Sequence, residues 1–266
     1  MKKIISHVLD NVQPSLLDSF FEKASEQKDV ISLSVGEPDF NTPWHIAIKG
    51  IQAIQDGKTF YTPSMGLPEL RLAIADQIKK KYNCNFSFKQ ILITNGVSEA
   101  IDIVLRSLIN RGDEIILTDP GYVSYEPCVL LSGGMPIHLK LEEKDGFKIT
   151  SQKLKSLITS KTKALIINYP NNPTGATMNG NELNIIAKIC FDNNIVVISD
   201  EIYSDLIYDD SSGSILNCDK KYIDNIIYVD GLSKSYAMTG WRIGYIVANN
   251  QLIKCFKTVH QWYRSC

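Results

Sequence analysis

Residues 164–200 read ALIINYPNNPTGATMNGNELNIIAKICFDNNIVVISD, and this stretch carries the main signal of the fold class. Ala164–Asn168 and Ile195–Ser199 are short, continuous apolar runs, which is typical of strands that are buried on both faces. Between them, Leu183–Phe191 shows the apolar spacing of a helix. Strand, helix and strand in this order predict a mostly parallel sheet that helices cover on both faces.

The same alternation continues on both sides of this stretch. Three more strands and two more helices are expected, namely strands at Ile91–Thr94, Glu114–Thr118 and Ile226–Asp230 and helices at Ala100–Ile109 and Leu252–Tyr263. The sequence therefore predicts an α/β protein with three layers, α/β/α. The first forty residues differ, because they contain an amphipathic helix around Pro14–Ala24 and then the segment Ile31–Phe40.

The composition excludes several classes of partner. The 266 residues include 28 Lys and Arg and 29 Asp and Glu, a formal charge of −1, so no basic field is present for nucleic acid or an anionic membrane. No run of about 18 apolar residues is present, which excludes a membrane-spanning helix. We expect a small-molecule partner.

The six cysteines are widely scattered, and only four histidines accompany them. No pair of cysteines has the C-x-x-C spacing of a zinc or redox site, so we expect no metal site. Scattered cysteines in a chain of this length are typical of reduced thiols. We therefore expect a cytoplasmic protein.

Polar groups follow the predicted strands. Ligands of an open parallel sheet gather at the carboxyl ends of its strands, so these groups are expected to converge on one edge. They are Asn95-Gly96-Val97-Ser98-Glu99, Asp119-Pro-Gly-Tyr122, Tyr169-Pro-Asn-Asn172-Pro-Thr-Gly175, Asp200-Glu-Ile-Tyr203 and Gly231-Leu-Ser233-Lys234.

Each group has an ordinary structural explanation when it is taken alone. A single lysine such as Lys234 is most often a solvated surface charge. Asp200 at a strand end is as often a turn cap as a catalytic group. Gly96-Val-Ser98 is also a plain helix start, and Tyr122 is compatible with simple packing. The set as a whole favours a functional site.

Three blocks carry a resemblance to a known family. They are Tyr-Pro-Asn-Asn-Pro-Thr-Gly (169–175), Ser-Asp-Glu-Ile-Tyr (199–203) and Ser-Lys-Ser-Tyr-Ala-Met-Thr-Gly-Trp-Arg-Ile-Gly-Tyr (233–245). These blocks resemble the signatures of class I/II, fold-type-I aminotransferases that depend on pyridoxal 5'-phosphate. The similarity extends to Gly36-Glu-Pro-Asp-Phe40, to Tyr61-x4-Gly66-x3-Leu70-Arg71 and to Gly96-Val-Ser-Glu-Ala-Ile-Asp102, in the order of the family. It therefore covers nearly the whole chain.

The resemblance implies a catalytic set around the cofactor ring. Lys234 is expected to form the Schiff base with the cofactor and then to carry a proton between two carbons of the substrate. Asp200 is expected to face the protonated ring nitrogen, and Tyr203 and Asn172 to hydrogen-bond the phenolic oxygen. Tyr122 is expected to stack on the ring.

The resemblance also implies a phosphate site and a substrate site. The Gly96-Val97-Ser98 turn offers backbone N–H groups at a helix N-terminus, and Arg242 and Ser233 are expected to add side-chain contacts. Gly36 and Asn172 are expected to contact the amino-acid or 2-oxo-acid substrate. Tyr61 resembles a residue that reaches the phosphate of a neighbouring subunit, so we expect a homodimer.

The resemblance suggests a division of the chain into two parts. Residues 1–45 are expected to form an N-terminal arm and a segment of the small domain, and residues 46–266 the large cofactor-binding domain. Relatives continue beyond this point, so we expect the small domain to be largely missing and these 266 residues to transaminate little. Ser98 stands where some subgroups carry a lysine for dicarboxylic substrates, which argues against a dedicated aspartate enzyme and leaves aromatic or broad specificity open.

Other functions remain open at this point. Gly96-Val-Ser98-Glu-Ala100 is one residue away from the G-x-S-x-G motif of hydrolases, but only His138 and His260 follow it as candidate bases. A cofactor-dependent C–S lyase shares the fold, the lysine and the aspartate. A truncated relative without turnover is the third alternative.

Overall fold

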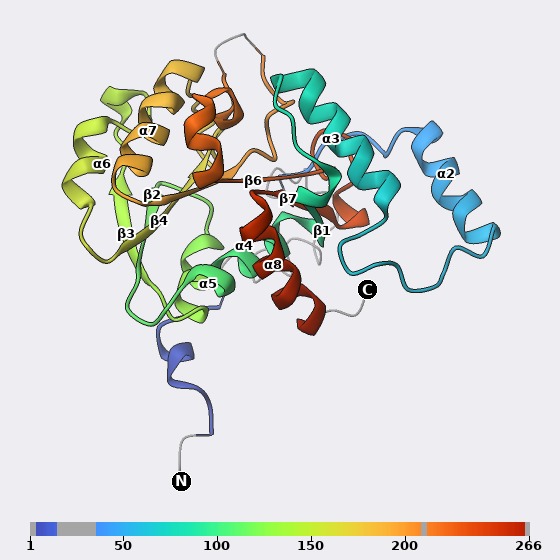
Figure 1. Cartoon of the computed structure of the whole chain (residues 1–266), viewed down its shortest axis with the longest axis horizontal. Coiled ribbons are helices and arrows are strands. Elements are labelled where there is room, and N and C mark those ends of the chain that lie inside the picture. The colour runs from blue at the N-terminus through green and yellow to red at the C-terminus, as the bar shows by residue number, and fades with distance from the viewer. Residues whose placement is uncertain (1–3, 15–35, 209–211, 264–266) are drawn as a thin grey trace, which may run out of the picture.

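A computed structural model of the chain describes residues 4–14, 36–208 and 212–263. Within these ranges the strands form one seven-stranded sheet in the order β1-β7-β6-β5-β4-β2-β3 (Figure 1). The strands are β1 Ile91–Asn95, β2 Glu114–Asp119, β3 Met135–Lys140, β4 Thr162–Asn168, β5 Val196–Asp200, β6 Ile226–Gly231 and β7 Ile243–Val247. The α-helices are α2 Trp44–Gln55, α3 Pro68–Tyr82, α4 Gly96–Leu108, α5 Tyr125–Leu131, α6 Ser151–Leu157, α7 Gly180–Asp192 and α8 Asn250–Tyr263. The short 3-10 helices are η1 His7–Asp10, η2 Phe88–Gln90, η3 Glu143–Asp145, η4 Ile215–Asn217, η5 Lys220–Asn225 and η6 Thr239–Trp241.

The sheet is mostly parallel, as predicted. The pairs β2–β3, β2–β4, β4–β5 and β5–β6 are parallel, and β7 runs antiparallel to both β6 and β1. Since two reversals cancel, β1 points the same way as β6. All strands except β7 therefore end at one edge of the sheet. β7 begins at that edge, so Arg242, which precedes it, lies there too.

Two apolar layers cover the two faces of the sheet. One core cluster joins the strands to α3, α6 and α7, and the other joins them to α4, α5 and α8. In β4 the side chains alternate between the two, because Leu165 and Ile167 belong to the first cluster and Ala164 and Ile166 to the second. The continuous apolar run of this strand follows from burial on both faces. The predicted three-layer α/β/α fold is confirmed.

The helix and strand bounds differ from the sequence prediction at the starts of helices and at the edge of the sheet. α7 begins at Gly180 rather than at Leu183, because Asn179 and Glu182 form a capping box. α4 begins at Gly96 rather than at Ala100. β3 was not predicted, since it is an edge strand that pairs with β2 alone and contains Pro136 and His138 in place of a continuous apolar run.

The N-terminal region is only partly described. The expected helix around Pro14–Ala24 lies outside the described residues except for Pro14, and so does the first half of the segment Ile31–Phe40, residues 31–35. α2 stands away from the sheet in Figure 1 and has no buried residue. It begins at Trp44, so the predicted domain boundary after residue 45 falls inside this helix. That boundary stays a prediction.

Candidate active site

The ends of β4 and β5 bring three of the predicted site residues together. Asn168 and Asp200 are register partners at the last position of these strands. The Asn168 side chain donates from Nδ2 to the Asp200 carbonyl at 2.8 Å and accepts at Oδ1 from the Asn172 backbone N–H at 2.8 Å. Asn172 Nδ2 in turn donates to the Tyr203 hydroxyl at 3.4 Å. The buried Asn168 therefore fixes the loop that carries Asn172 against the segment that carries Tyr203.

Asp200 is a buried carboxylate with two donors. The Tyr125 hydroxyl donates to its Oδ2 at 2.7 Å, and the Ile202 backbone N–H donates to its Oδ1 at 3.1 Å. Burial raises the pKa of Asp200 to about 6, although both hydrogen bonds act in the opposite direction. The buried Asp200 carboxylate has no cation among these partners, so it is suited to pair with a positively charged group. The protonated ring nitrogen of the expected cofactor is such a group.

Lys234 lies three residues beyond the end of β6 and is half-buried. Its Nζ donates a hydrogen bond to the Gly36 carbonyl and lies 5.7 Å from the centre of the Tyr203 ring. Burial lowers the pKa of Lys234, Glu37 raises it and Arg242 lowers it. A lysine with a lowered pKa has a larger neutral fraction, which is the form that attacks a carbonyl carbon.

Two glycines create a cradle where α4 begins. Gly96 has a φ of +74° and is the first residue of α4. A Cβ added to Gly96 would lie 2.5 Å from Nη2 of Arg242, and one added to Gly244 would lie 2.5 Å from the Gly96 carbonyl carbon and 2.7 Å from the Val97 nitrogen. Both positions therefore require glycine, so that β7 and the guanidinium of Arg242 can approach the turn closely.

The cradle has the character of an anion site. The first N–H groups of α4, including those of Val97 and Ser98, have no helical acceptor, and the helix dipole adds partial positive charge. Arg242 supplies a full positive charge, with Nη1 donating to the Thr239 carbonyl at 3.1 Å. Its φ of +57° is uncommon for a side chain other than glycine, which marks a constrained position. A phosphate fits this set of donors.

The remaining predicted site residues are Tyr122, Ser233, Gly36 and Tyr61, and they differ in exposure. Tyr122 is half-buried, and its ring meets that of Tyr125 edge-on with centroids 5.4 Å apart. Ser233 is buried beside Lys234. Gly36 contacts Lys234 through its carbonyl. Tyr61 lies between α2 and α3 and is 88% exposed, so it stands apart from the other residues within this chain.

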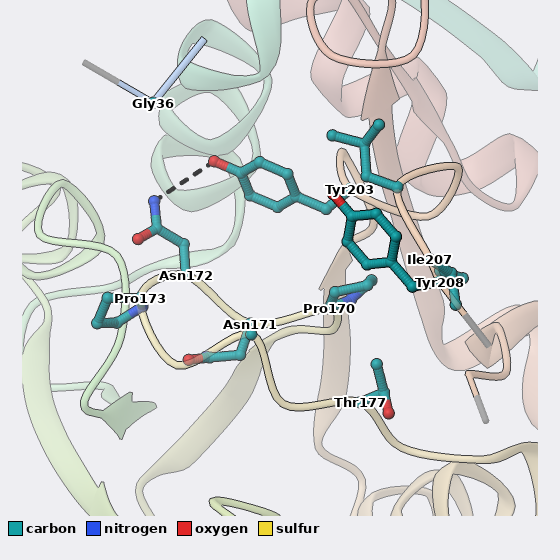
Figure 2. Close-up of a pocket in the computed structure, with 11 residues that line it drawn as sticks. Gly36, Pro170, Asn171, Asn172, Pro173, Thr177, Tyr203, Ile207 and Tyr208 are labelled. Atoms are coloured by element: carbon teal, nitrogen blue, oxygen red, sulfur yellow. Dashed lines mark hydrogen bonds between the residues drawn. The ribbon is translucent and has the colours of Figure 1, made fainter. Parts of the chain in front are cut away.

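A pocket of about 460 Å³ opens next to Asn172 and Tyr203. Figure 2 shows the Tyr203 hydroxyl pointing toward the Asn172 amide at one side of it, with Gly36 nearby. Pro170 and Tyr208 contribute apolar surface to the wall. The pocket therefore joins a polar side, at the sheet edge, to an apolar side of the kind that holds small organic molecules.

The structure opposes the hydrolase alternative. His138 lies on β3, and Ser98 follows β1, which is at the opposite end of the sheet order. His260 is buried on α8, with Nε2 3.9 Å from Glu99 Oε2. Ser98 is exposed at the first turn of α4, where a phosphate-binding turn is expected. No group of three or more His, Cys, Asp or Glu suited to a metal ion occurs in the part of the chain that the structure describes.

Comparison with known proteins identifies the family. Residues 28–266 match the model of the aminotransferase class I and II family. The chain belongs to this family. It is 40% identical over 264 residues to an aspartate aminotransferase of Pyrococcus abyssi, covering 98% of this chain and 68% of that protein. It is 39% identical over 268 residues to a probable N-acetyl-LL-diaminopimelate aminotransferase of Bacillus subtilis, covering 100% of this chain and 67% of that protein.

Solved structures of aminotransferases share the fold. An aspartate aminotransferase from Thermus thermophilus with maleate superposes with a TM-score of 0.94 at 31% identity, covering 99% of this chain and 69% of that chain. The chain thus spans about two thirds of the length of these relatives. Because the relatives carry the names of aminotransferases, amino-group transfer is favoured over C–S lysis. None of the described helices is both long and apolar enough to cross a membrane.

The residues of this aminotransferase fit pyridoxal 5'-phosphate. The glycine cradle beside Arg242 matches the phosphate, because a Cβ at Gly96 or Gly244 would remove the space that the close approach needs. The buried Asp200 matches a protonated ring nitrogen, and the Asn172–Tyr203 pair offers donors for a phenolate oxygen. Lys234 lies beside the Tyr203 ring, within reach of the same space.

Two further buried carboxyl groups of the aminotransferase are those of Glu201, which follows Asp200 directly, and of Asp230, near the end of β6. Glu201 accepts at Oε1 from the Ile215 N–H at 2.8 Å and from Ser199 Oγ at 3.1 Å. Asp230 accepts at Oδ2 from the hydroxyls of Tyr228 and Tyr245, both at 2.9 Å. Burial raises the pKa of Glu201 to about 7 and that of Asp230 also to about 7. None of these partners is a cation, so the charged forms are costly.

We expect Glu201→Gln to stabilise the protein at pH 8 but not at pH 4. The folded chain binds the Glu201 proton more tightly than the unfolded chain, so the free energy of unfolding falls as the pH rises from about 4.5 to about 7. The amide removes this titration and keeps an acceptor. The gain at pH 8 should be roughly 2–3 kcal/mol, measured by denaturant unfolding at both pH values. Exposed Glu143→Gln is the control, and equal midpoints for Glu201→Gln and parent at pH 8 would contradict a charged, buried Glu201.

Proposed function

We propose that this chain binds pyridoxal 5'-phosphate through Lys234 and transfers an amino group from an amino acid to a 2-oxo acid. The cofactor, when bound, withdraws electrons from the bonds next to the amine that is joined to it. The Nζ of Lys234, once free, accepts a proton from one substrate carbon and returns it to another. The position of Lys234 beside Tyr203 and its lowered pKa support this role.

Three side chains are proposed to hold and polarise the cofactor ring. The Asp200 carboxylate, oriented by Tyr125 and by the Ile202 N–H, pairs with the protonated ring nitrogen. Asn172 and Tyr203 donate hydrogen bonds to the phenolic oxygen and favour its ionised form. Tyr122 stacks on the ring face, supported by its position beside Tyr125.

The phosphate is proposed to lie in the glycine cradle. The N–H groups of Gly96, Val97 and Ser98 would bind its oxygens, and Arg242 and Ser233 would add side-chain contacts. A substitution at Gly96 or Gly244 would fill the cradle, so this part of the proposal rests on close packing as well as on charge.

The substrate is proposed to enter through the pocket beside Gly36 and Asn172. The pocket volume of about 460 Å³ suits an amino acid or a 2-oxo acid, and Asn172 lies on the side that faces the proposed ring position. The relatives act, by their names, on aspartate and on N-acetyl-LL-diaminopimelate, both of which are acidic amino acids. An acidic amino acid is therefore the substrate class to test first.

The observation that carries the proposal is a set of contacts at one edge of the sheet. Lys234 lies beside the Tyr203 ring, and the Tyr203 hydroxyl accepts from Asn172. Asn168 connects the loop of Asn172 to Asp200. The test of the proposal is borohydride reduction of the protein with pyridoxal phosphate, followed by peptide mapping. Covalent label on Lys234 is the expected result. Label on another lysine with Lys234 unmodified would refute the assignment, and release of pyruvate from a cysteine-type substrate would favour the lyase.

We further propose that the functional state is a homodimer in a reducing, cytoplasmic compartment. α2 and the loop after it leave large apolar side chains in solvent, with Trp44 and Ile54 70% exposed, Phe60 87% and Tyr61 88%. Several large apolar side chains exposed on one helix and the loop after it are typical of a surface that another chain covers. A second copy would bring Tyr61 to the neighbouring phosphate, which ties cofactor affinity to assembly. The described cysteines are free thiols, which suits the compartment.

We expect sedimentation to show a dimer for the parent and a monomer for Ile54→Glu. The glutamate places a charge in the proposed interface, and pyridoxal phosphate should then bind at least about tenfold more weakly, because a contact made across the interface is lost. Ile185→Glu on α7, where the parent side chain is 50% exposed, is the matched control. A monomeric parent that retains tight cofactor binding would contradict the proposal.

A further inference from the structure

Residues 36–42, which we call the strap, lie against the block that contains Lys234. Thr42 Oγ1 donates to the Ala237 carbonyl at 2.6 Å and accepts from the indole Nε1 of Trp241 at 3.0 Å. At the other end of the strap, the Gly36 carbonyl accepts from Lys234. These contacts join segments that are nearly 200 residues apart in the sequence. The strap is therefore anchored at both of its ends, on Lys234 and on the residues that follow it.

α2 continues this anchoring. Gly50 on α2 packs on the Trp241 ring, and a Cβ at that position would lie 2.6 Å and 2.9 Å from two ring atoms. The absence of a side chain at Gly50 lets the helix sit directly on the indole. Because Trp241 also donates to Thr42, the same ring fixes both α2 and the strap.

Glu37 is a charged residue of the strap that contributes to its anchoring. Its Oε2 accepts a hydrogen bond from Thr239 Oγ1 at 3.2 Å, and its charge acts on Lys234. Arg242 acts on the same ammonium with the opposite sign. The Tyr203 ring lies beside the Lys234 Nζ, and the Gly36 carbonyl accepts a hydrogen bond from it. Lys234 is therefore subject to two opposing charges, that of Glu37 on the strap and that of Arg242 at the glycine cradle.

We propose that Glu37 is a positioning residue for Lys234: held on Thr239, its carboxylate keeps the strap over the lysine and offsets the positive charge of Arg242. This inference rests on the proposed role of Lys234 as the cofactor lysine. Without Glu37, burial and Arg242 both disfavour the ammonium form. The Glu37 carboxylate thus raises the protonated fraction of Lys234 before the cofactor attaches, against the larger opposing effect of burial.

Three variants separate the effect of the Glu37 charge from the effect of its packing. Glu37→Gln removes the charge but keeps an oxygen that accepts from Thr239. Thr239→Val removes the donor and keeps the charge in the segment. Asp39→Asn, two residues further along the strap, removes a carboxylate of the same segment and is the matched control.

Competitive acetylation of the cofactor-free protein with trace acetic anhydride, read by peptide mass spectrometry across pH 6–11, measures the neutral fraction of Lys234 directly. We expect Glu37→Gln to raise acetylation of Lys234 by about two- to fivefold below its pKa, the range of a solvent-screened interaction between two charges, with a lowered midpoint. Asp39→Asn should leave the profile unchanged. Far-UV circular dichroism and thermal unfolding check that each variant is folded.

The possible outcomes are distinguishable. An unchanged Lys234 profile in folded Glu37→Gln overturns the inference, as does an equal change in Asp39→Asn. A change in Thr239→Val alone would assign Glu37 a packing role only, which also overturns it. The proposed function fails by a different result, since borohydride would then leave Lys234 unlabelled whatever its acetylation profile.

Discussion

Lys234→Ala abolishes the covalent attachment of pyridoxal phosphate after borohydride reduction, and this is the largest effect that we expect. The variant removes the amine that lies beside the Tyr203 ring and donates to the Gly36 carbonyl. Loss of the group that moves the proton should lower amino-group transfer by roughly 10²–10⁴-fold. Mass spectrometry of the reduced protein measures the attachment, and single-turnover kinetics with an acidic amino acid measures the rate.

The fold should survive this substitution. Lys234 is only half-buried, and its contacts to the rest of the chain are polar, so the free energy of unfolding should change by roughly 1 kcal/mol or less. Lys89→Ala, at an exposed lysine of η2, is the matched control and should retain full labelling of Lys234. A fully labelled Lys234→Ala protein would show that another lysine holds the cofactor.

Much of this architecture could be predicted from the chain because its signals are local. The apolar runs of β4 and β5 and the helix between them are contiguous, and parallel strands bring their carboxyl ends to one edge by geometry alone. The groups that follow these strands were therefore expected to meet. The structure places Asn168 and Asp200 as register partners, which explains why Asn172 and Tyr203 lie within hydrogen-bonding distance.

The sequence could not predict features that depend on pairing between distant segments. The Tyr125 hydroxyl meets Asp200 across 75 positions, and nothing near Tyr125 distinguishes it from a packing aromatic. The requirement for glycine at position 244 arises from the approach of β7 to the α4 turn, which needs the order of the sheet to be known. Glu37 and Thr239 meet across 202 positions. Their motifs were visible, but the contact between them was not.

Asp200 and Glu201 are consecutive acidic residues at the sheet edge, but their hydrogen-bond partners differ. Asp200 has the Tyr125 hydroxyl and a backbone N–H as donors, and its pKa of about 6 leaves it largely ionised at pH 8. Glu201 points to the opposite side of the chain, where its donors are the Ile215 N–H and Ser199. Neighbouring carboxyls in one motif thus have different surroundings, and only Asp200 belongs to the proposed cofactor site. A test of Asp200 must therefore measure the rate of amino-group transfer and the affinity for the cofactor separately.

We expect Asp200→Asn to lower the rate of amino-group transfer by roughly 10²–10³-fold, a barrier increase of about 3–4 kcal/mol. An amide cannot pair with a protonated ring nitrogen as a carboxylate does, and Tyr125 and Ile202 donate to different oxygens of Asp200, of which the amide keeps only one as an acceptor. Cofactor affinity should fall much less, because the phosphate contacts at Gly96 and Arg242 are unchanged. Single-turnover kinetics and equilibrium binding of pyridoxal phosphate separate the two effects. Tyr125→Phe is the matched comparison, since it removes one donor and leaves the charge, so its rate should lie between those of the parent and Asp200→Asn. Equal rates for Asp200→Asn and the parent would show that Asp200 does not face the ring nitrogen.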